Sequence, residues 1–343
     1  MSKKLGIKDI AEALNISKAS VSVVLNGKAR QYGISAKLEK EVLEFAQKIN
    51  YLPSSLAIGL STGKSKTIGM LVEDISDPFF ASIARIVEKN AAAFGYRVLY
   101  GSTENDTLQA LDLLKTFRSY QVEGFIIAPP PGINAYINQL ISEGCPIVMF
   151  DRSIDNLRCD TILVDNFKGA YTATKHLIEN GYRNIAMITI LSGQDQMDER
   201  IRGYKTAMHQ SNLPEVVETI AYNDHHEECS RAIKALIQKK PQIDAFFFAT
   251  NYLAIGGLAA FKELSLIVPD NIGVVVFDDN TNFELFNPSI SAVAQPIEEI
   301  GQEVIRLLLM HLEGNVNMLK GNLTLQTQLK PRNSSQPPHV ILK

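Results

Sequence analysis

The stretch "TIGMLVEDISDPFFASIARIVEKNAAAFGYRVLYG", residues 67–101, contains the alternation of patterns that decides the fold class. It begins with a continuous apolar run at 67–72, continues with apolar residues at helical spacing over 80–96, and ends with a second apolar run at 97–101. Short runs that are apolar throughout are typical of strands buried on both faces, as in parallel sheets. The stretch therefore predicts a β-α-β unit with parallel strands.

The same alternation continues along the rest of the chain. Further strand-like runs occur at 123–129, 146–151, 184–190, 244–250 and 272–278. Segments with helical periodicity separate these runs, and several of them close at a glycine. The pattern predicts a doubly wound α/β architecture, and its length favours two similar parallel-sheet subdomains with a cleft between them. Ligands of such sheets bind beyond the carboxyl ends of the strands, so residues directly after each run are candidate contacts.

The first 50 residues differ because they show helical patterns and no credible strand. "KDIAEALNISKASVSVVLNG", residues 8–27, predicts two short helices joined by a tight turn, with Ser17 as the N-cap of the second helix. A third helix is expected over 36–51, followed by a connector rich in Pro, Ser and Gly at 52–66, where we place the domain boundary. The apolar faces of these three helices consist of Ile10, Ala11, Leu14, Val21, Val24, Leu25, Leu38, Val42, Leu43, Phe45, Ala46 and Ile49.

Charge is divided unevenly between this helical head and the rest of the chain. Residues 1–66 hold eleven Lys and Arg against five acidic residues, a net charge of +6, whereas the whole chain has a net charge of −3. A small basic head on an acidic body is typical of a nucleic-acid-binding module attached to a domain with another task. The alternative interpretation is a solvated surface with scattered lysines.

Composition excludes several classes of protein. The 343 residues are 45% hydrophobic and 21% charged, as in ordinary globular proteins. Cys145, Cys159 and Cys229 show no paired spacing, so neither a disulfide framework nor a zinc ribbon is expected. No apolar run is long enough to span a bilayer and no signal-peptide pattern occurs, which predicts a cytoplasmic protein. No nucleophile, base and orienting group stand at a catalytic spacing, so we expect no enzyme, cofactor or metal site.

Several motifs follow one another along nearly the whole chain. They include "IKDIAEALNIS", "INYLPSSLAIGLSTGKSKTIGMLVEDISDPFF", "PIVMFDR", "DERIRGY" and "VPDNIGVVVFDD". In order and spacing they resemble the lactose-repressor (LacI) family of bacterial transcription regulators. The resemblance implies a helix-turn-helix headpiece at 4–52, a hinge helix and linker at 53–66, and a periplasmic-binding-protein-like core of two subdomains at 67–343. It also implies a homodimeric repressor that binds a pseudo-palindromic double-stranded DNA operator and a small carbohydrate-related effector.

The resemblance also implies which headpiece residues contact DNA. Lys18 and Ala19, at the start of the recognition helix, are expected to read base edges in the major groove. Leu60 matches the hinge leucine that wedges into the minor groove and kinks the central base step. The residues expected near the DNA backbone or in the hinge are Ser17, Ser20, Ser22, Asn26 and Ser54.

The headpiece departs from the family pattern in two places. Val23 stands where the family often has Arg, and a valine can at most contact a thymine methyl group. The segment "KARQYGISAK", 28–37, is longer than the usual turn of the family. Its Lys28 and Arg30 either contact phosphates or are simply solvated, and the two interpretations are equally supported.

A set of residues at the ends of the strand-like runs matches the effector pocket of the family. Aromatic rings, carboxylates, amides and a guanidinium suit a polyol, because rings stack on C–H patches while the polar groups bond hydroxyls. Each residue also has a purely structural explanation, as core, turn cap or helix ion pair. The expected contacts are Phe79, Phe80, Asp151, Arg200, Asn251, Asp278 and Gln295.

One departure concerns the effector. Tyr252 follows Asn251 where the family usually has Asp, so one hydroxyl acceptor is lost beside Arg200 and Arg152. A sugar acid or a sugar phosphate is therefore a hypothesis beside a neutral sugar. The rival function is a cytosolic solute-binding or sugar-converting protein whose helical head serves oligomerisation.

Overall fold

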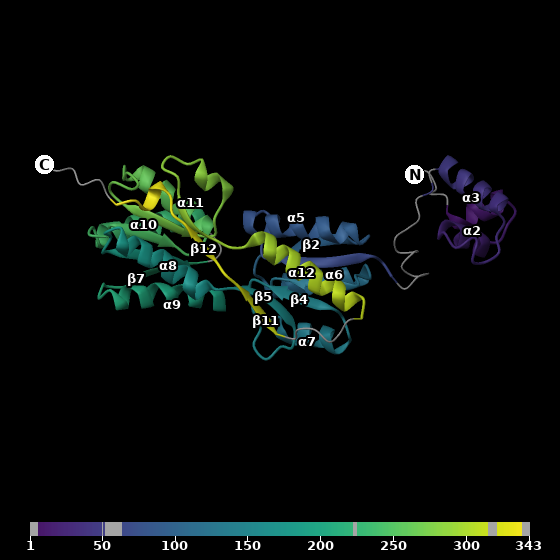
Figure 1. Cartoon of the computed structure of the whole chain (residues 1–343), viewed down its shortest axis with the longest axis horizontal. Helices are drawn as coiled ribbons and strands as arrows, with labels where there is room; N and C mark the ends of the chain where they lie inside the picture. Colours follow the sequence, from purple (N-terminus) through teal and green to yellow (C-terminus); the bar gives the residue numbers. More distant parts are fainter. Residues whose placement is uncertain (1–5, 50, 52–63, 222–224, 315–320, 338–343) are drawn as a thin grey trace. The chain divides into compact units, whose positions relative to one another are not determined.

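The computed structural model describes residues 6–49, 51, 64–221, 225–314 and 321–337 (Figure 1). The chain separates into two compact units, of which the first contains the residues up to 66 together with 118–123 and the second contains the rest. No helix of the described part is long and apolar enough to cross a membrane.

The headpiece is a three-helix bundle. Its helices are α1 (Ile7–Ala13), α2 (Lys18–Leu25) and α3 (Ala36–Lys48). Ser17 caps α2, and Asn15 adopts the left-handed backbone, with φ 51°, that the tight turn between α1 and α2 requires. The fully buried core of the bundle includes Ile10, Val21 and Val42, as the periodicity predicted. Leu43 was expected on the apolar face but is 47% exposed, because its position in α3 lies beyond the stripe that meets α1 and α2.

The second unit contains two six-stranded sheets. In the first sheet all neighbouring strands are parallel, in the order β11-β5-β4-β3-β1-β2. Helix α12 packs against α5 and against β3 and β4. The elements of this subdomain are β1 (Thr67–Val72), α5 (Pro78–Ala93), β2 (Arg97–Ser102), α6 (Thr107–Ser119), β3 (Gly124–Ile127), α7 (Asn134–Ser142), β4 (Ile147–Phe150), β5 (Asp160–Val164), α12 (Ile297–Leu312) and β11 (Asn322–Leu325).

The second sheet has the order β12-β10-β9-β8-β6-β7 and is parallel except for β12, which pairs antiparallel with β10. The central strand β8 reads Ala-Phe-Phe-Phe and is buried along its whole length. The elements are α8 (Asn166–Glu179), β6 (Ile185–Ile190), α9 (Asp195–Gln210), β7 (Val216–Ile220), α10 (His225–Lys239), β8 (Ala245–Phe248), α11 (Asn251–Glu263), β9 (Gly273–Phe277), β10 (Ser291–Ala294) and β12 (Gln328–Lys330).

The chain passes between the two subdomains at separate points, which places both sheets in one unit. It crosses after β5, again between β10 and α12, and finally between β11 and β12 (Figure 1). The predicted architecture of two doubly wound parallel-sheet subdomains is confirmed. The C-terminal segment supplies one strand to each sheet, β11 to the first and β12 to the second.

Candidate functional site

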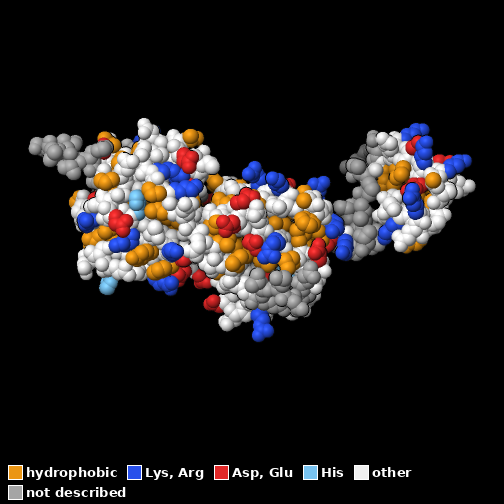
Figure 2. Space-filling view, viewed as in Figure 1, with side chains coloured by type: hydrophobic (Ala, Val, Ile, Leu, Met, Phe, Trp, Pro, Cys, Tyr) orange, Lys and Arg blue, Asp and Glu red, His pale blue; other side chains and the backbone are white. Residues whose placement is uncertain are grey.

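The exposed start of α2 is the candidate DNA-reading surface. The Ser17 hydroxyl accepts a hydrogen bond from the backbone N–H of Ser20 at 3.0 Å, which satisfies one of the free donors of the first turn. Lys18 and Ala19 are exposed directly after this cap. Figure 2 shows Lys and Arg side chains over the visible face of the headpiece. The start of α2 therefore offers a cation and a small side chain, with little bulk to prevent close approach to a groove.

The other candidate DNA contacts on α2 are less exposed than Lys18 and Ala19. Ser20 and Ser22 are partly exposed, and Ser22 accepts a hydrogen bond from the Asn26 side chain at 3.3 Å. Val23 is half-buried, whereas Lys28 and Arg30 are exposed. The hinge candidates Ser54 and Leu60 lie outside the described residues.

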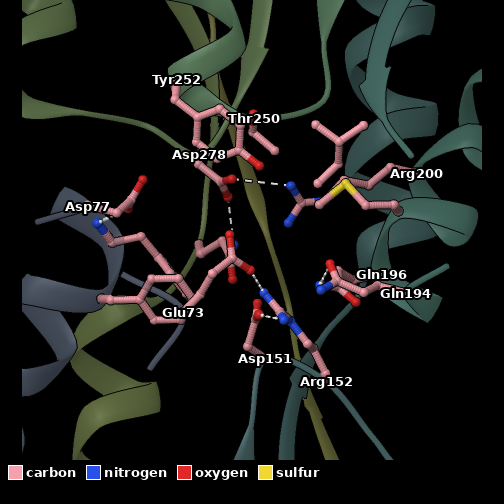
Figure 3. A pocket seen from close by; sticks show the side chains of 15 residues that line it. Glu73, Asp77, Asp151, Arg152, Gln194, Gln196, Arg200, Thr250, Tyr252 and Asp278 are labelled. Carbon is pink, nitrogen blue, oxygen red and sulfur yellow. Dashed lines mark hydrogen bonds and ion pairs between the residues drawn. The ribbon is translucent and has the colours of Figure 1, made fainter. Parts of the chain in front are cut away.

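A cavity in the second unit lies beyond the carboxyl ends of strands from both sheets (Figure 3). Its free volume is about 40 Å³, because charged side chains fill most of the space. Figure 3 shows these side chains converging from opposite sides. The lining residues are Glu73, Asp77, Phe79, Phe80, Asp151, Arg152, Ile190, Gln194, Gln196, Met197, Arg200, Thr250, Tyr252, Asp278 and Gln295.

Arg152 holds together the side of the cavity formed by the first subdomain. It donates to Asp151 at 3.0 Å, to Asn105 at 2.8 Å and to Glu73, and it is only 6% exposed. The buried guanidinium is thus fully engaged by two carboxylates and one amide. Burial lowers the pKa of Arg152, but the two carboxylates outweigh it and the pKa is raised.

Arg200 has the corresponding place in the second subdomain. Its guanidinium donates to Asn166 at 2.9 Å, to the Ala249 carbonyl at 2.6 Å and to Asp278 at 3.1 Å. It also lies over the Phe277 ring, 3.6 Å from the ring centroid. A charge that is 1% exposed needs such partners, because unpaired burial costs several kcal/mol.

Asp77 and Asn251 face each other across the cavity's edge. Asp77 caps α5 by accepting from the Phe79 N–H at 2.7 Å, and Asn251, the first residue of α11, donates to it. Burial raises the pKa of Asp77 to about 7, against the lowering effect of the Phe79 hydrogen bond, and Asp278 and Glu73 raise it further. Burial likewise raises the pKa of Asp151, although Arg152 and Arg200 oppose the shift.

Two glutamines leave buried acceptors without a partner. Gln196 is 4% exposed and donates to Gln194 at 3.0 Å, but its Oε1 atom receives no hydrogen bond from the described residues. Gln295 is 8% exposed and donates to Asp278 at 2.6 Å, and its Oε1 atom is likewise unpaired. Buried unpaired acceptors are uncommon and costly, so these atoms point to a ligand that supplies donors.

Comparison with known proteins decides the family. Residues 6–54 match the profile of the bacterial regulatory proteins of the lacI family, and residues 174–335 match a periplasmic binding protein-like domain. A ribose operon repressor of Halalkalibacterium halodurans is 31% identical over 307 residues, which cover 90% of each chain. The chain belongs to the LacI family. The transcriptional repressor PurR of Aliivibrio fischeri is also 31% identical, over 90% of this chain and 91% of that protein.

Solved structures of LacI-family regulators share the fold of the core. A regulator from Alkaliphilus metalliredigens, complexed with D-xylulofuranose, has a TM-score of 0.69 at 25% identity and covers 78% of this chain and 98% of that one. A regulator from Enterococcus faecium with bound ribose has a TM-score of 0.72, over 79% of this chain and 99% of that one, at 24% identity. The second likeness supports the fold alone.

The cavity brings together most of the residues that the LacI resemblance singled out. Phe79, Phe80, Asp151, Arg200, Asp278 and Gln295 all line it. Asn251 does not; it lines an adjoining cavity together with Glu73, Asp77 and Tyr252.

Sequence reasoning missed the cavity residues Glu73, Asp77, Gln194 and Gln196. Glu73 directly follows the first strand, so the strand-end argument that selected Asp151 and Asp278 was sufficient to find it. Gln194 and Gln196 follow β6 by a few residues, and their signal is weaker because a loop intervenes.

Proposed function

We propose that this protein is a transcription repressor that binds a pseudo-palindromic operator and is controlled by a polyhydroxylated, carbohydrate-related effector in the core cavity. The observation that carries the proposal is the combination, in one LacI-family chain, of an exposed recognition helix and a cavity whose donors and acceptors converge from two subdomains. The two sequence relatives named above are repressors, and the regulator from Alkaliphilus metalliredigens is complexed with D-xylulofuranose.

The donor and acceptor set supports an effector rich in hydroxyl groups. Glu73, Asp151 and Asp278 each retain acceptor capacity beside their arginine partners, and the two unpaired glutamine oxygens add two more acceptors. Phe79 and Phe80 stand edge to face, with ring centroids 5.0 Å apart, and offer apolar surface to the C–H face of a sugar ring. The proposed contacts in this cavity are Phe79, Phe80, Asp151, Arg200, Asp278 and Gln295, and Asn251 is proposed as a contact from the adjoining cavity.

The small volume of the cavity supports a link between binding and conformation. Ligand pockets are commonly about 300 Å³ or larger, whereas this cavity offers about 40 Å³. A sugar therefore enters only if the subdomains separate or the ion pairs rearrange. A ligand that binds one arrangement better shifts the population toward it, which is the physical basis of effector control.

A homodimer is part of the proposal because the surface that one headpiece offers to DNA is small. A single recognition helix contacts a few base pairs, whereas two headpieces related by a two-fold axis read two half-sites of a palindrome. In this proposal the headpiece spans 4–52, with Ser17, Lys18, Ala19, Ser20, Ser22 and Asn26 at the DNA. The hinge at 53–66 supplies Ser54 and Leu60, and the effector-binding and dimerisation core spans 67–343. The protein acts in the cytoplasm, where its operator is found.

Selection of bound duplexes from a random pool, with the full-length protein at near-physiological salt, tests this function. We expect a pseudo-palindromic sequence to be enriched, and its affinity to fall steeply as salt rises because Lys and Arg displace counterions from phosphates. The Leu60→Ala variant is expected to lose the preference for the central base step. Failure to enrich any sequence would favour the rival solute-binding function.

A further inference from the structure

We infer that the effector carries a protonated amine on its hydroxylated skeleton, as an amino sugar or an amino-polyol does. The inference rests on the proposed function of the cavity and names the chemical class of its ligand. Its basis is the imbalance between cations and acceptors in the cavity and in the space that adjoins it.

Both arginines of the cavity already pair with carboxylates. Arg152 is bonded to Glu73, Asp151 and Asn105, and Arg200 is bonded to Asn166, the Ala249 carbonyl and Asp278. Each guanidinium is therefore already neutralised by a buried carboxylate, although Nη2 of Arg200 has no hydrogen bond among the described residues. A ligand anion at that donor would lie beside the carboxylate of Asp278, and like-charge repulsion disfavours it.

The carboxylates that line the cavity outnumber its guanidinium groups. The lining contains four carboxylates, on Glu73, Asp77, Asp151 and Asp278, against the two guanidinium groups. Among the described residues, the hydrogen-bond partners of Asp77 are neutral groups, the Phe79 N–H and the Asn251 amide. The unpaired Oε1 atoms of Gln196 and Gln295 are also acceptors and are at least nine-tenths buried. A ligand with a cationic donor satisfies this set, whereas an anion adds to its excess of negative charge.

An adjoining cavity extends the acidic surface. It has a volume of about 300 Å³ and shares Glu73, Asp77 and Tyr252 with the first cavity. Asp74 adds another carboxylate, and no Lys, Arg or His is among the described residues that line it. Pro78, Ile255 and Phe283 give it apolar surface. We therefore place the ammonium group near Asp77, where the two cavities meet.

Binding of matched compounds to the full-length protein, measured by calorimetry at pH 7.5, tests this inference. The panel compares 2-amino-2-deoxyhexoses and 1-amino-1-deoxypolyols with their hydroxyl parents, their N-acetyl derivatives, the sugar acids and the sugar 6-phosphates. We expect at least one amine to bind tenfold or more tightly than its parent and its N-acetyl derivative. The Asp77→Asn variant, whose amide keeps the helix cap, should abolish this preference. Asp112→Asn, on the exposed face of α6, is the matched control and should retain it.

Other outcomes overturn the inference in distinguishable ways. Equal or tighter binding of neutral sugars would contradict the amine while leaving the effector site in place. Preferential binding of sugar acids or phosphates would support the opposite charge preference that Arg200 and Arg152 suggested from the sequence. Absence of binding by every compound of the panel also overturns it, and operator selection then decides separately whether the protein is a DNA-binding regulator.

Discussion

Asp151 and Asp278 occupy equivalent places in the two subdomains. Each directly follows a buried strand, β4 or β9, and each has left-handed backbone, with φ of 68° and 74°. Such backbone costs on the order of 1 kcal/mol for a residue other than glycine, although Asp tolerates it better than most. Both carboxylates accept hydrogen bonds from an arginine of the cavity. Local strain is thus retained where the chain directs polar groups toward the candidate site.

Replacement of Arg200 by lysine is predicted to impair the effector site selectively. Lysine retains the charge but not the planar fork, so Asn166 or the Ala249 carbonyl loses its donor. We expect a loss of about 2 kcal/mol in the free energy of unfolding and at least tenfold weaker effector binding, measured by urea titration and calorimetry. Arg202→Lys, an exposed residue paired with Glu199 on the same helix, is the control and should change neither quantity measurably. Equal effects in both variants would argue against the role of Arg200.

The raised pKa of Asp77 predicts that the free energy of unfolding depends on pH, with a defined sign. Because its folded-state pKa is about 7 and its ordinary value is 3.8, the folded protein retains a proton that the unfolded chain releases. Its contribution to stability is complete below about pH 4 and is lost as the pH rises toward 7. The groups that face it are Asp278, Glu73, Asn251 and the Phe79 N–H.

The measurement is urea unfolding of the wild type and Asp77→Asn at several pH values between 5 and 8. We expect the variant to become more stable relative to the wild type as the pH rises, because an amide does not ionise. A constant difference across this range would show that Asp77 titrates near its ordinary pKa.

Single residues of the site were predictable in two ways. Asp151 and Asp278 follow strand-like runs, whereas Arg200 belongs to the LacI-like motif "DERIRGY", and the structure places all three around one cavity. The pairing of both arginines with carboxylates was not predictable, because it depends on contacts between residues far apart in the chain, such as Arg152 with Glu73. The hypothesis of a sugar acid effector rests on the sequence, which does not reveal these pairs.

At the scale of elements, the local sequence of α2 determines which of its side chains are exposed to DNA. Its cap at Ser17 fixes where the helix begins, and buried Val21 and Val24 fix which side faces the bundle. Lys18 and Ala19 then lie outside by the helical repeat. The orientation of the recognition surface is therefore a consequence of the apolar pattern.

Lys18→Ala is predicted to weaken operator binding about tenfold, because a base or phosphate contact of a lysine contributes about 1–3 kcal/mol. Fluorescence anisotropy with the selected duplex measures this effect. Lys40→Ala, an exposed lysine of α3 paired with Glu44, is the matched control and should bind nearly normally. Equal losses would indicate a general charge effect and no specific role for the start of α2.

Six of the seven strands that were predicted from apolar runs lie inside their sheets, and the seventh, β2, lies at a sheet edge. All seven apolar runs form strands, β1 to β4, β6, β8 and β9. The strands β5, β7, β10, β11 and β12 were missed or merged because they are short or interrupted by polar residues. β11 and β12 lie at sheet edges, where one side of the strand has no partner and the apolar signal is weak.

At the scale of the whole core, hydrogen bonds connect the two subdomains beside the cavity. Asn105, which follows β2, accepts from Arg152 at 2.8 Å and from Gln194, which follows β6, at 2.7 Å. Ser153 donates to Asp195 at 3.2 Å across the same side. These bonds join groups from both subdomains and therefore stabilise their present arrangement.

Gln194→Met is predicted to loosen this arrangement, because methionine has a similar length and no N–H donor. Because a sugar enters only when the subdomains separate or the ion pairs rearrange, we expect effector affinity to rise about fivefold, by the loss of a hydrogen bond of about 1 kcal/mol that stabilises the present arrangement. The control for calorimetry is Gln139→Met, which removes an exposed hydrogen bond to Glu143 at the end of α7 and should leave effector affinity unchanged. Unchanged or lower affinity in Gln194→Met would show that the bond to Asn105 does not hold the subdomains in the present arrangement.

The central claim is that the core cavity controls the headpiece, and one measurement tests it most directly. Operator affinity of the full-length protein is measured by anisotropy at fixed salt, with and without a saturating compound that calorimetry has shown to bind. We expect at least a tenfold change in operator affinity, and an equal change in ligand affinity when the operator is present, because coupling free energies are reciprocal. A ligand that binds the protein and leaves operator affinity unchanged would contradict it.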